Sequence, residues 1–142
     1  MKKNIIFICI HNSARSQMAE AYMKYFHQKD FNCYSAGLEQ GKLNPIVVDA
    51  MLMDNIDISQ NRSEIIDKYL NSNINFDYIV TVCDQASAQK CPYFPGNGKR
   101  IHFGFEDPSS LNGTYKENLK NTILIRDKIK NKVKTLEIIN DK

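Results

Sequence analysis

The stretch NIIFICIHNSARSQMAEA, residues 4–21, decides the fold, because its pattern changes from that of a strand to that of a helix. Residues 4–8 form a continuous β-rich apolar run, which is typical of a strand buried on both faces. Residues 14–28 follow, with Met18, Tyr22 and Phe26 at a spacing of four that places them on one helix face. A buried strand followed by an amphipathic helix predicts the first half of a βαβ unit.

The rest of the chain repeats this alternation. Further strands are predicted at residues 31–36, 76–82 and 100–105. Further helices are predicted at residues 44–55, opened by Asn44-Pro45, at residues 63–70 with Ser63 as N-cap, and at residues 115–139. The last helix is expected to bury Ile125, Ile129, Val133 and Leu136. The order predicts an α/β fold, a three-layer α/β/α domain with a four-stranded parallel sheet.

Length and composition exclude several classes of protein. The chain has 142 residues, 42% of them hydrophobic, which suits one globular domain spanning residues 1–142. Its formal net charge of +3 is too small to indicate nucleic-acid binding. The apolar run at residues 5–10 is shorter than the about 7–15 residues of a signal peptide core and the about 20 of a membrane span. We therefore expect a cytoplasmic monomer that binds neither nucleic acid nor membrane.

The loop that follows the first strand has the composition of an anion-binding site. Five residues, Ile10, His11, Asn12, Ser13 and Ala14, separate Cys9 from Arg15. Such a loop can turn its backbone N–H groups inward, and the helix N-terminus adds further donors. Arg15 can bind two oxygens of a tetrahedral anion, while Cys9 lies beneath its central atom as a nucleophile. The Ser16 hydroxyl is placed to donate to the Cys9 thiolate.

Several motifs together resemble a known family. These are the segment HNSARSQMAEA after Cys9, the SAGL at residues 35–38, the NP at residues 44–45 and the HFGFEDP at residues 102–108. They resemble the low-molecular-weight protein tyrosine phosphatase superfamily, and more closely its arsenate reductase branch. The resemblance covers almost the whole chain and implies the four-stranded parallel sheet, a nucleophilic Cys9 and an anion-binding Arg15.

Asp107 and two further cysteines complete the expected site. Asp107 precedes Pro108 and matches the family's general acid, which we prefer to its neighbour Glu106. Cys83 and Cys91 lack the close spacing of a zinc pair. Two other interpretations stay open, namely that they are buried thiols or that they are surface cysteines without a function. The resemblance implies a relay in which Cys83 attacks Cys9, arsenite leaves, and Cys91 then attacks Cys83. The loop between Cys83 and Cys91 must reorganise for this.

The resemblance also implies partners and one cofactor. Arsenate is the expected substrate, with phosphate or sulfate as competing anions, and thioredoxin is the expected reductant, ahead of glutaredoxin or a small thiol. No metal cofactor is expected beyond a potassium ion, whose positions in some reductases match Asn12, Glu20, Ser35 and Glu64.

The chain departs from the family pattern in three features. Glu64 stands where Asp is found, and Ala14 where some members carry a further Cys. Seven residues separate the two relay cysteines, where six is usual.

Two other functions were weighed. A tyrosine phosphatase of this family usually follows Asp-Pro with Tyr and carries an aromatic residue after the SAG motif. This chain has Ser109-Ser110 after Asp107-Pro108 and no aromatic residue at 39–43, which favours the reductase. A non-catalytic anion-binding module would leave Asp107 and the relay cysteines without a role. Cys33 and His102 are expected to be packing residues, and His11 to shape or tune the loop.

Overall fold

The computed structural model describes residues 1–83 and 94–140. Its sheet contains four strands, β1 (Lys3–Cys9), β2 (Phe31–Gly37), β3 (Tyr78–Thr81) and β4 (Lys99–His102). They are all parallel, in the order β2-β1-β3-β4. The predicted four-stranded parallel sheet is therefore confirmed.

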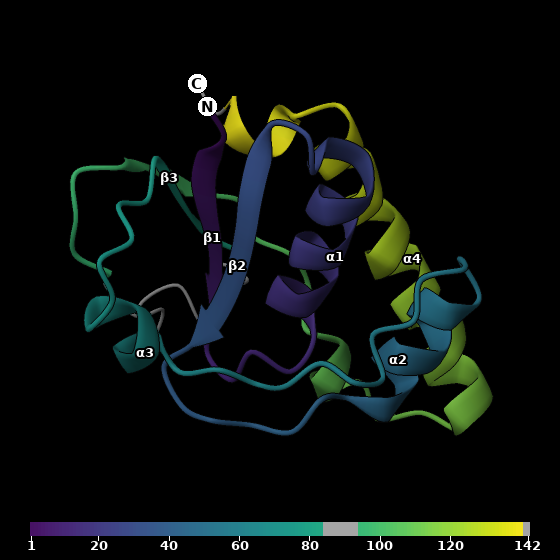
Figure 1. Cartoon of the computed structure of the whole chain (residues 1–142). Helices are drawn as coiled ribbons and strands as arrows, with labels where there is room; N and C mark the ends of the chain where they lie inside the picture. The colour runs from purple at the N-terminus through teal and green to yellow at the C-terminus, as the bar shows by residue number, and fades with distance from the viewer. Residues whose placement is uncertain (84–93, 141–142) are drawn as a thin grey trace.

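Helices cover both faces of the sheet. They are α1 (Arg15–His27), α2 (Pro45–Leu52), α3 (Ile66–Leu70) and α4 (Tyr115–Lys134). In Figure 1, α1, α2 and α4 lie together on one side of the sheet, and the short α3 lies on the other. This arrangement is the predicted three-layer architecture, with one thick helical layer and one thin one.

The central strand β1 explains the apolar run that opens the sequence. Ile5 and Phe7 point into the main core beneath α1 and α4, whereas Ile6 and Ile8 point into a second core on the α3 side. All four side chains are completely buried. A strand buried on both faces has no position at which a polar residue would meet water, so its sequence does not alternate.

Several predicted boundaries are wrong. Strands β3 and β4 are shorter than their apolar runs, because buried residues such as Val82 and Phe105 belong to the loops that follow them. Helix α4 ends at Lys134, since Leu136 adopts a left-handed conformation with φ 61°. A 3-10 turn, η3 (Glu137–Ile139), follows, and Leu136, predicted on the buried side of the helix, lies beyond its end and packs half-buried against the core. Similarly, α2 ends at Leu52, three residues before the predicted end at Asn55.

Ser63 does not cap a helix, contrary to the prediction. Helix α3 begins only at Ile66, and its N-cap residue Ile65 makes no capping hydrogen bond with its side chain. The Ser63 hydroxyl instead donates to the carbonyl of His11 at 2.8 Å and accepts from the backbone N–H of Gly41 at 3.0 Å. Ser63 therefore supports the loop after β1. Within the described part of the chain, no helix is long and apolar enough to cross a membrane.

Candidate active site

The loop between β1 and α1 lies where the parallel strands end, beside the arrowhead of β2 in Figure 1. Gly37, the last residue of β2, allows the loop to pack closely against it. A Cβ atom on Gly37 would lie 2.7 Å from the backbone nitrogen of Asn12 and 2.8 Å from backbone atoms of His11 and Ile10. The backbone N–H of Glu39 also donates to the carbonyl of Ile10 at 2.9 Å. These contacts give the loop a rigid floor.

The sulfur of Cys9 lies inside this loop and is surrounded by hydrogen-bond donors. The backbone N–H of Asn12 points at Cys9 Sγ at 3.2 Å, because Asn12 adopts a left-handed conformation with φ 52°. Ser16 Oγ lies 3.0 Å from the same sulfur. Asn12 Nδ2 donates to Ser16 Oγ at 2.7 Å, and the Ser16 hydroxyl can accept this bond while it donates its own hydrogen to a Cys9 thiolate. The donors around Cys9 suit a negatively charged sulfur.

The Arg15 side chain is buried next to the loop, and one of its N–H donors has no partner among the described residues. Its side chain is 5% exposed. Its Nη1 donates to the carbonyl of Phe105 at 3.2 Å, and its Nη2 lies 3.4 Å from Asp107 Oδ2. The Nε of Arg15 is buried and has no hydrogen-bond partner among the described residues. A buried donor without a partner is costly, and an anion bound in the loop would supply one.

The N-terminus of α1 adds donors at the same place. The residue before the helix, Ala14, has no side chain that can cap the helix. The first N–H groups of a helix have no partner within it, and they attract anions. Within the loop, Ala14 is buried and Ser13 and Ile10 are half-buried. His11 is exposed, and its Nε2 lies 3.7 Å from Glu39 Oε2.

Asp107 reaches the site from the loop after β4. Its Oδ1 accepts from the backbone N–H of Ser109 at 2.9 Å and so caps the 3-10 turn η2 (Pro108–Ser110). Its other oxygen faces Arg15, whereas the neighbouring Glu106 is exposed. The structure therefore places Asp107 beside Arg15, at the rim of the sheet where the sequence predicted it.

Asn44 joins the loop between β1 and α1, here called the anion loop, to the loop after β4 that carries Asp107. The sequence did not reveal this role. Its backbone N–H donates to the carbonyl of Ser13 at 3.0 Å, and its Nδ2 donates to Ser109 Oγ at 2.9 Å. Its Oδ1 accepts from the N–H of Ile46 and caps α2, as predicted for the Asn-Pro pair. One residue, through its backbone and its side chain, therefore connects the loop of Cys9 to the loop of Asp107.

Cys83 lies two residues beyond β3, the strand next to β1. The register pairs Ile8 with Thr81, and the N–H of Val82 donates to the carbonyl of Ile8 at 2.9 Å. Cys83 is completely buried and belongs to the same core cluster as Cys9. The fold thus brings both cysteines to one rim of the sheet. Cys91 lies outside the described residues.

The remaining predicted packing residues differ in outcome. Cys33 is buried within β2, as predicted, and burial raises the pKa of its thiol to about 12. Such a thiol stays protonated at neutral pH and is a poor nucleophile. His102 is not a core residue, contrary to the prediction. It is exposed on β4, where its Nδ1 lies 2.7 Å from Thr81 Oγ1.

The residues expected to hold potassium gather around one small pocket. Glu20, Ser35 and Glu64 line a pocket of about 140 Å³, and Asn12 touches it through the N–H of Glu64, which donates to Asn12 Oδ1 at 2.9 Å. Their oxygen atoms are of the kind that hard cations prefer. Each carboxylate already pairs with the lysine four residues further on, at 2.7 and 2.8 Å. No group of three or more His, Cys, Asp or Glu among residues 1–83 and 94–140 could hold a metal ion.

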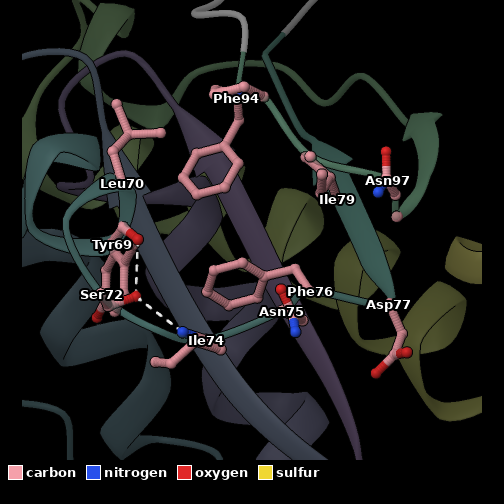
Figure 2. A pocket seen from close by; sticks show the side chains of 13 residues that line it. Tyr69, Leu70, Ser72, Ile74, Asn75, Phe76, Asp77, Ile79, Phe94 and Asn97 are labelled. Atoms are coloured by element: carbon pink, nitrogen blue, oxygen red, sulfur yellow. Dashed lines mark hydrogen bonds between the residues drawn. The ribbon is translucent and has the colours of Figure 1, made fainter.

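A second hollow lies away from this site. It has a volume of about 560 Å³ and opens on the α3 side of the sheet. Figure 2 shows Phe76 and Phe94 next to each other in its lining, with Tyr69 nearby, and the centroids of the two phenyl rings lie 5.4 Å apart in an edge-to-face contact. None of its lining residues belongs to the anion loop or to the loop of Asp107.

Sequence reasoning missed one further buried residue at the site. Gln17 follows Ser16 in the first turn of α1, is 1% exposed, and donates to both oxygens of Asn12. A polar residue next to the Cys-x5-Arg motif was the only available signal, because its partners at residues 61–62 come from a distant part of the chain.

A four-stranded parallel sheet with a Cys-x5-Arg loop after its first strand suits the class of proteins that bind a tetrahedral oxyanion at this loop. A family model described as low molecular weight phosphotyrosine protein phosphatase matches residues 4–137. The chain belongs to this family.

Its relatives include arsenate reductases. The arsenate reductase of Bacillus licheniformis is 44% identical over 133 residues, which cover 94% of each chain. A solved arsenate reductase in a phosphate-binding state aligns with a TM-score of 0.75 at 25% identity, covering 96% of this chain and 98% of the other. The arsenate reductase of Archaeoglobus fulgidus aligns with a TM-score of 0.66 at 28% identity, covering 91% and 98%.

Proposed function

We propose that this protein reduces arsenate to arsenite, with Cys9 as the nucleophile. The observation that carries the proposal is that Cys9, ringed by donors in an anion loop, shares the rim of the sheet with the buried Cys83 on the neighbouring strand. A phosphatase needs the first cysteine only. Reduction of arsenic(V) needs two electrons, and two thiols that become a disulfide supply them.

The first step binds and activates the anion. Arg15, the loop N–H groups and the start of α1 bind the oxygens of arsenate, so that the arsenic lies above Cys9 Sγ. The thiolate forms a sulfur–arsenic bond, one arsenic–oxygen bond breaks, and Asp107 donates a proton so that the departing oxygen leaves as water. Asp107 Oδ2 lies 3.4 Å from Arg15 Nη2, so its carboxyl group is within reach of an oxygen of an anion bound to the guanidinium.

The second step transfers the electrons. The Cys83 thiolate attacks Cys9 Sγ, a Cys9–Cys83 disulfide forms, and the sulfur–arsenic bond breaks with its electron pair on arsenic, which leaves as arsenite. Cys91 then attacks Cys83, which forms a Cys83–Cys91 disulfide and returns Cys9 as a thiolate. An external dithiol, thioredoxin in our proposal, reduces this last disulfide and is itself oxidised.

The setting of the reaction follows from this chemistry. Phosphate and sulfate are tetrahedral anions of similar size, so we infer that they compete with arsenate for the loop. We place the protein in the cytoplasm, where thiols are kept reduced, and expect it to act as a monomer.

One paired assay tests the function. Arsenate-dependent oxidation of thioredoxin and hydrolysis of p-nitrophenyl phosphate are measured on the same preparation of the full chain. We expect sustained arsenate turnover, and we expect Cys9→Ser to abolish both reactions. Hydrolysis of the phosphomonoester without any arsenate turnover would instead make the protein a phosphatase, and turnover by Cys9→Ser at the wild-type rate would refute the mechanism.

We also propose that the pocket of Glu20, Ser35 and Glu64 binds a potassium ion. The support is its set of oxygen ligands and its small volume. Thermal unfolding in KCl, NaCl and choline chloride at equal ionic strength tests this proposal. The melting temperature should rise most in KCl for the wild type and respond equally to all three salts in Glu20→Gln. An equal response of the wild type would contradict potassium binding.

A further inference from the structure

Gln17 occupies an unusual place for a polar side chain, because it is buried at the centre of the site without facing the anion. It is 1% exposed in the first turn of α1. Its Nε2 donates to the backbone carbonyl of Asn12 at 3.2 Å, to Asn12 Oδ1 at 3.0 Å and to the carbonyl of Arg62 at 2.9 Å. Its Oε1 accepts from Asn61 Nδ2 at 3.1 Å. Backbone carbonyls can only accept, so the orientation of the Gln17 amide is unambiguous.

These contacts determine which way the Asn12 side chain faces. Asn12 Oδ1 accepts from Gln17 Nε2 and from the backbone N–H of Glu64 at 2.9 Å. If the Asn12 amide were flipped, its NH2 group would face both of these donors. Asn12 Nδ2 must therefore point to Ser16 Oγ, where it donates at 2.7 Å. The Ser16 hydroxyl, which accepts from Asn12, can then donate its own hydrogen to a thiolate at Cys9 Sγ, 3.0 Å away.

Gln17 also supports the backbone of Asn12. This residue has φ 52°, a left-handed conformation that non-glycine residues rarely adopt. That conformation points the N–H of Asn12 at Cys9 Sγ. By binding the Asn12 carbonyl and the Arg62 carbonyl with one amide, Gln17 ties the anion loop to the segment before α3.

We propose that Gln17 is a positioning residue that holds both donors of Asn12, the backbone N–H and Nδ2, in the orientation that stabilises the Cys9 thiolate. The hydrogen bonds of the Gln17 side chain go to Asn12, Arg62 and Asn61, so Gln17 acts on Cys9 through Asn12 and Ser16. The inference rests on the proposed function in that it takes Cys9 as the nucleophile.

The test measures Cys9 directly and needs no arsenate. The full chain is alkylated with iodoacetamide across a range of pH, and the modified Cys9 peptide is quantified by mass spectrometry. Gln17→Met keeps the length of the side chain but removes its donors, and should move the half-point of Cys9 alkylation upward by about one pH unit, a tenfold change in the thiolate equilibrium. Gln17→Glu also lacks the amide donors and provides a second variant should Gln17→Met fail to fold.

Two controls separate positioning from general loss of stability. Asn61→Ala removes only the donor to Gln17 Oε1, so its alkylation profile should match the wild type. Ala21→Gly weakens the middle of α1 without touching Asn12, and should lower the melting temperature but leave the profile unchanged. In a Ser16→Ala background, Gln17→Met should produce a smaller shift, because part of its action passes through Ser16.

The outcomes are distinct. If both Gln17 variants lower the melting temperature as Ala21→Gly does and keep the wild-type alkylation profile, Gln17 is only a packing residue and the proposal is overturned. If the profile moves but the wild type reduces no arsenate, the positioning role stands and only the proposed reaction fails.

Discussion

The hydroxyl oxygen of Ser16 lies 3.0 Å from the sulfur of Cys9 in a completely buried contact. Asn12 Nδ2 also donates to this oxygen, so the Ser16 hydroxyl can accept from Asn12 and donate to a Cys9 thiolate at the same time. The end of β1 therefore places the proposed nucleophile against a hydroxyl from the first turn of the next helix.

We expect Ser16→Ala to slow formation of the first covalent adduct by about 10- to 100-fold, since a hydrogen bond to a charged group contributes about 1.5–3 kcal/mol. Rapid-mixing measurement of adduct formation on Cys9 checks this. Ser59→Ala, at an exposed position, is the matched control and should react as the wild type does. Equal rates in Ser16→Ala and Ser59→Ala would show that the contact is not used.

Asp107→Asn separates the acid from the cap. An asparagine can still accept the hydrogen bond from Ser109 N–H and cap η2, but it cannot donate the proton. Adduct formation should therefore slow by about 10²- to 10⁴-fold while the melting temperature changes little. The neighbouring Glu106→Gln is the control and should leave the rate unchanged. A large loss of stability at an unchanged rate would make Asp107 a structural cap.

Gly37→Ala tests the floor of the anion loop. The added Cβ would lie 2.7–2.8 Å from backbone atoms of Ile10, His11 and Asn12, and backbone cannot move aside as a flexible side chain can. We expect the free energy of unfolding to fall by about 1–3 kcal/mol and the rate of arsenate reduction to fall as well. At Gly113 the nearest atoms are side-chain atoms of Glu117 and Asn118, 3.0–3.1 Å away. Gly113→Ala should thus be tolerated, and equal losses in urea unfolding would contradict this account.

The parts of the site that the sequence predicted correctly depend on neighbours along the chain. Cys9 and Arg15 belong to one loop whose spacing is readable, and the apolar run of β1 reflects burial on both faces. The placement of Asp107 at the same rim followed from the rule that parallel strands end on one edge.

The errors and omissions arise from contacts between distant segments. Ser63 looked like a helix cap because its local pattern fits one, yet its partners are His11 and Gly41. The only signal for Gln17 was its place next to the Cys-x5-Arg motif, since its role depends on residues about 45 positions away that only the fold brings near. The predicted end of α4 failed because one residue, Leu136, takes a left-handed conformation that no Gly or Asn announces.

The relay predicts different failures for its two later cysteines. Without Cys83 the arsenic adduct on Cys9 has no internal attacker, so Cys83→Ser should release no arsenite. Without Cys91 the Cys9–Cys83 disulfide can still form, but the relay has no further thiol to attack Cys83 and return Cys9 as a thiolate. Both variants should lose sustained arsenate turnover yet keep phosphomonoester hydrolysis, which needs only Cys9, water and Asp107.

The most direct measurement is a single turnover of Cys91→Ser with excess arsenate, followed by arsenite quantification and mass spectrometry of a non-reduced digest. The account predicts one arsenite per protein molecule and a peptide pair joined by a Cys9–Cys83 disulfide, which is absent from Cys83→Ser treated in the same way. Sustained arsenate turnover with thioredoxin by both variants, with no such disulfide, would contradict the relay.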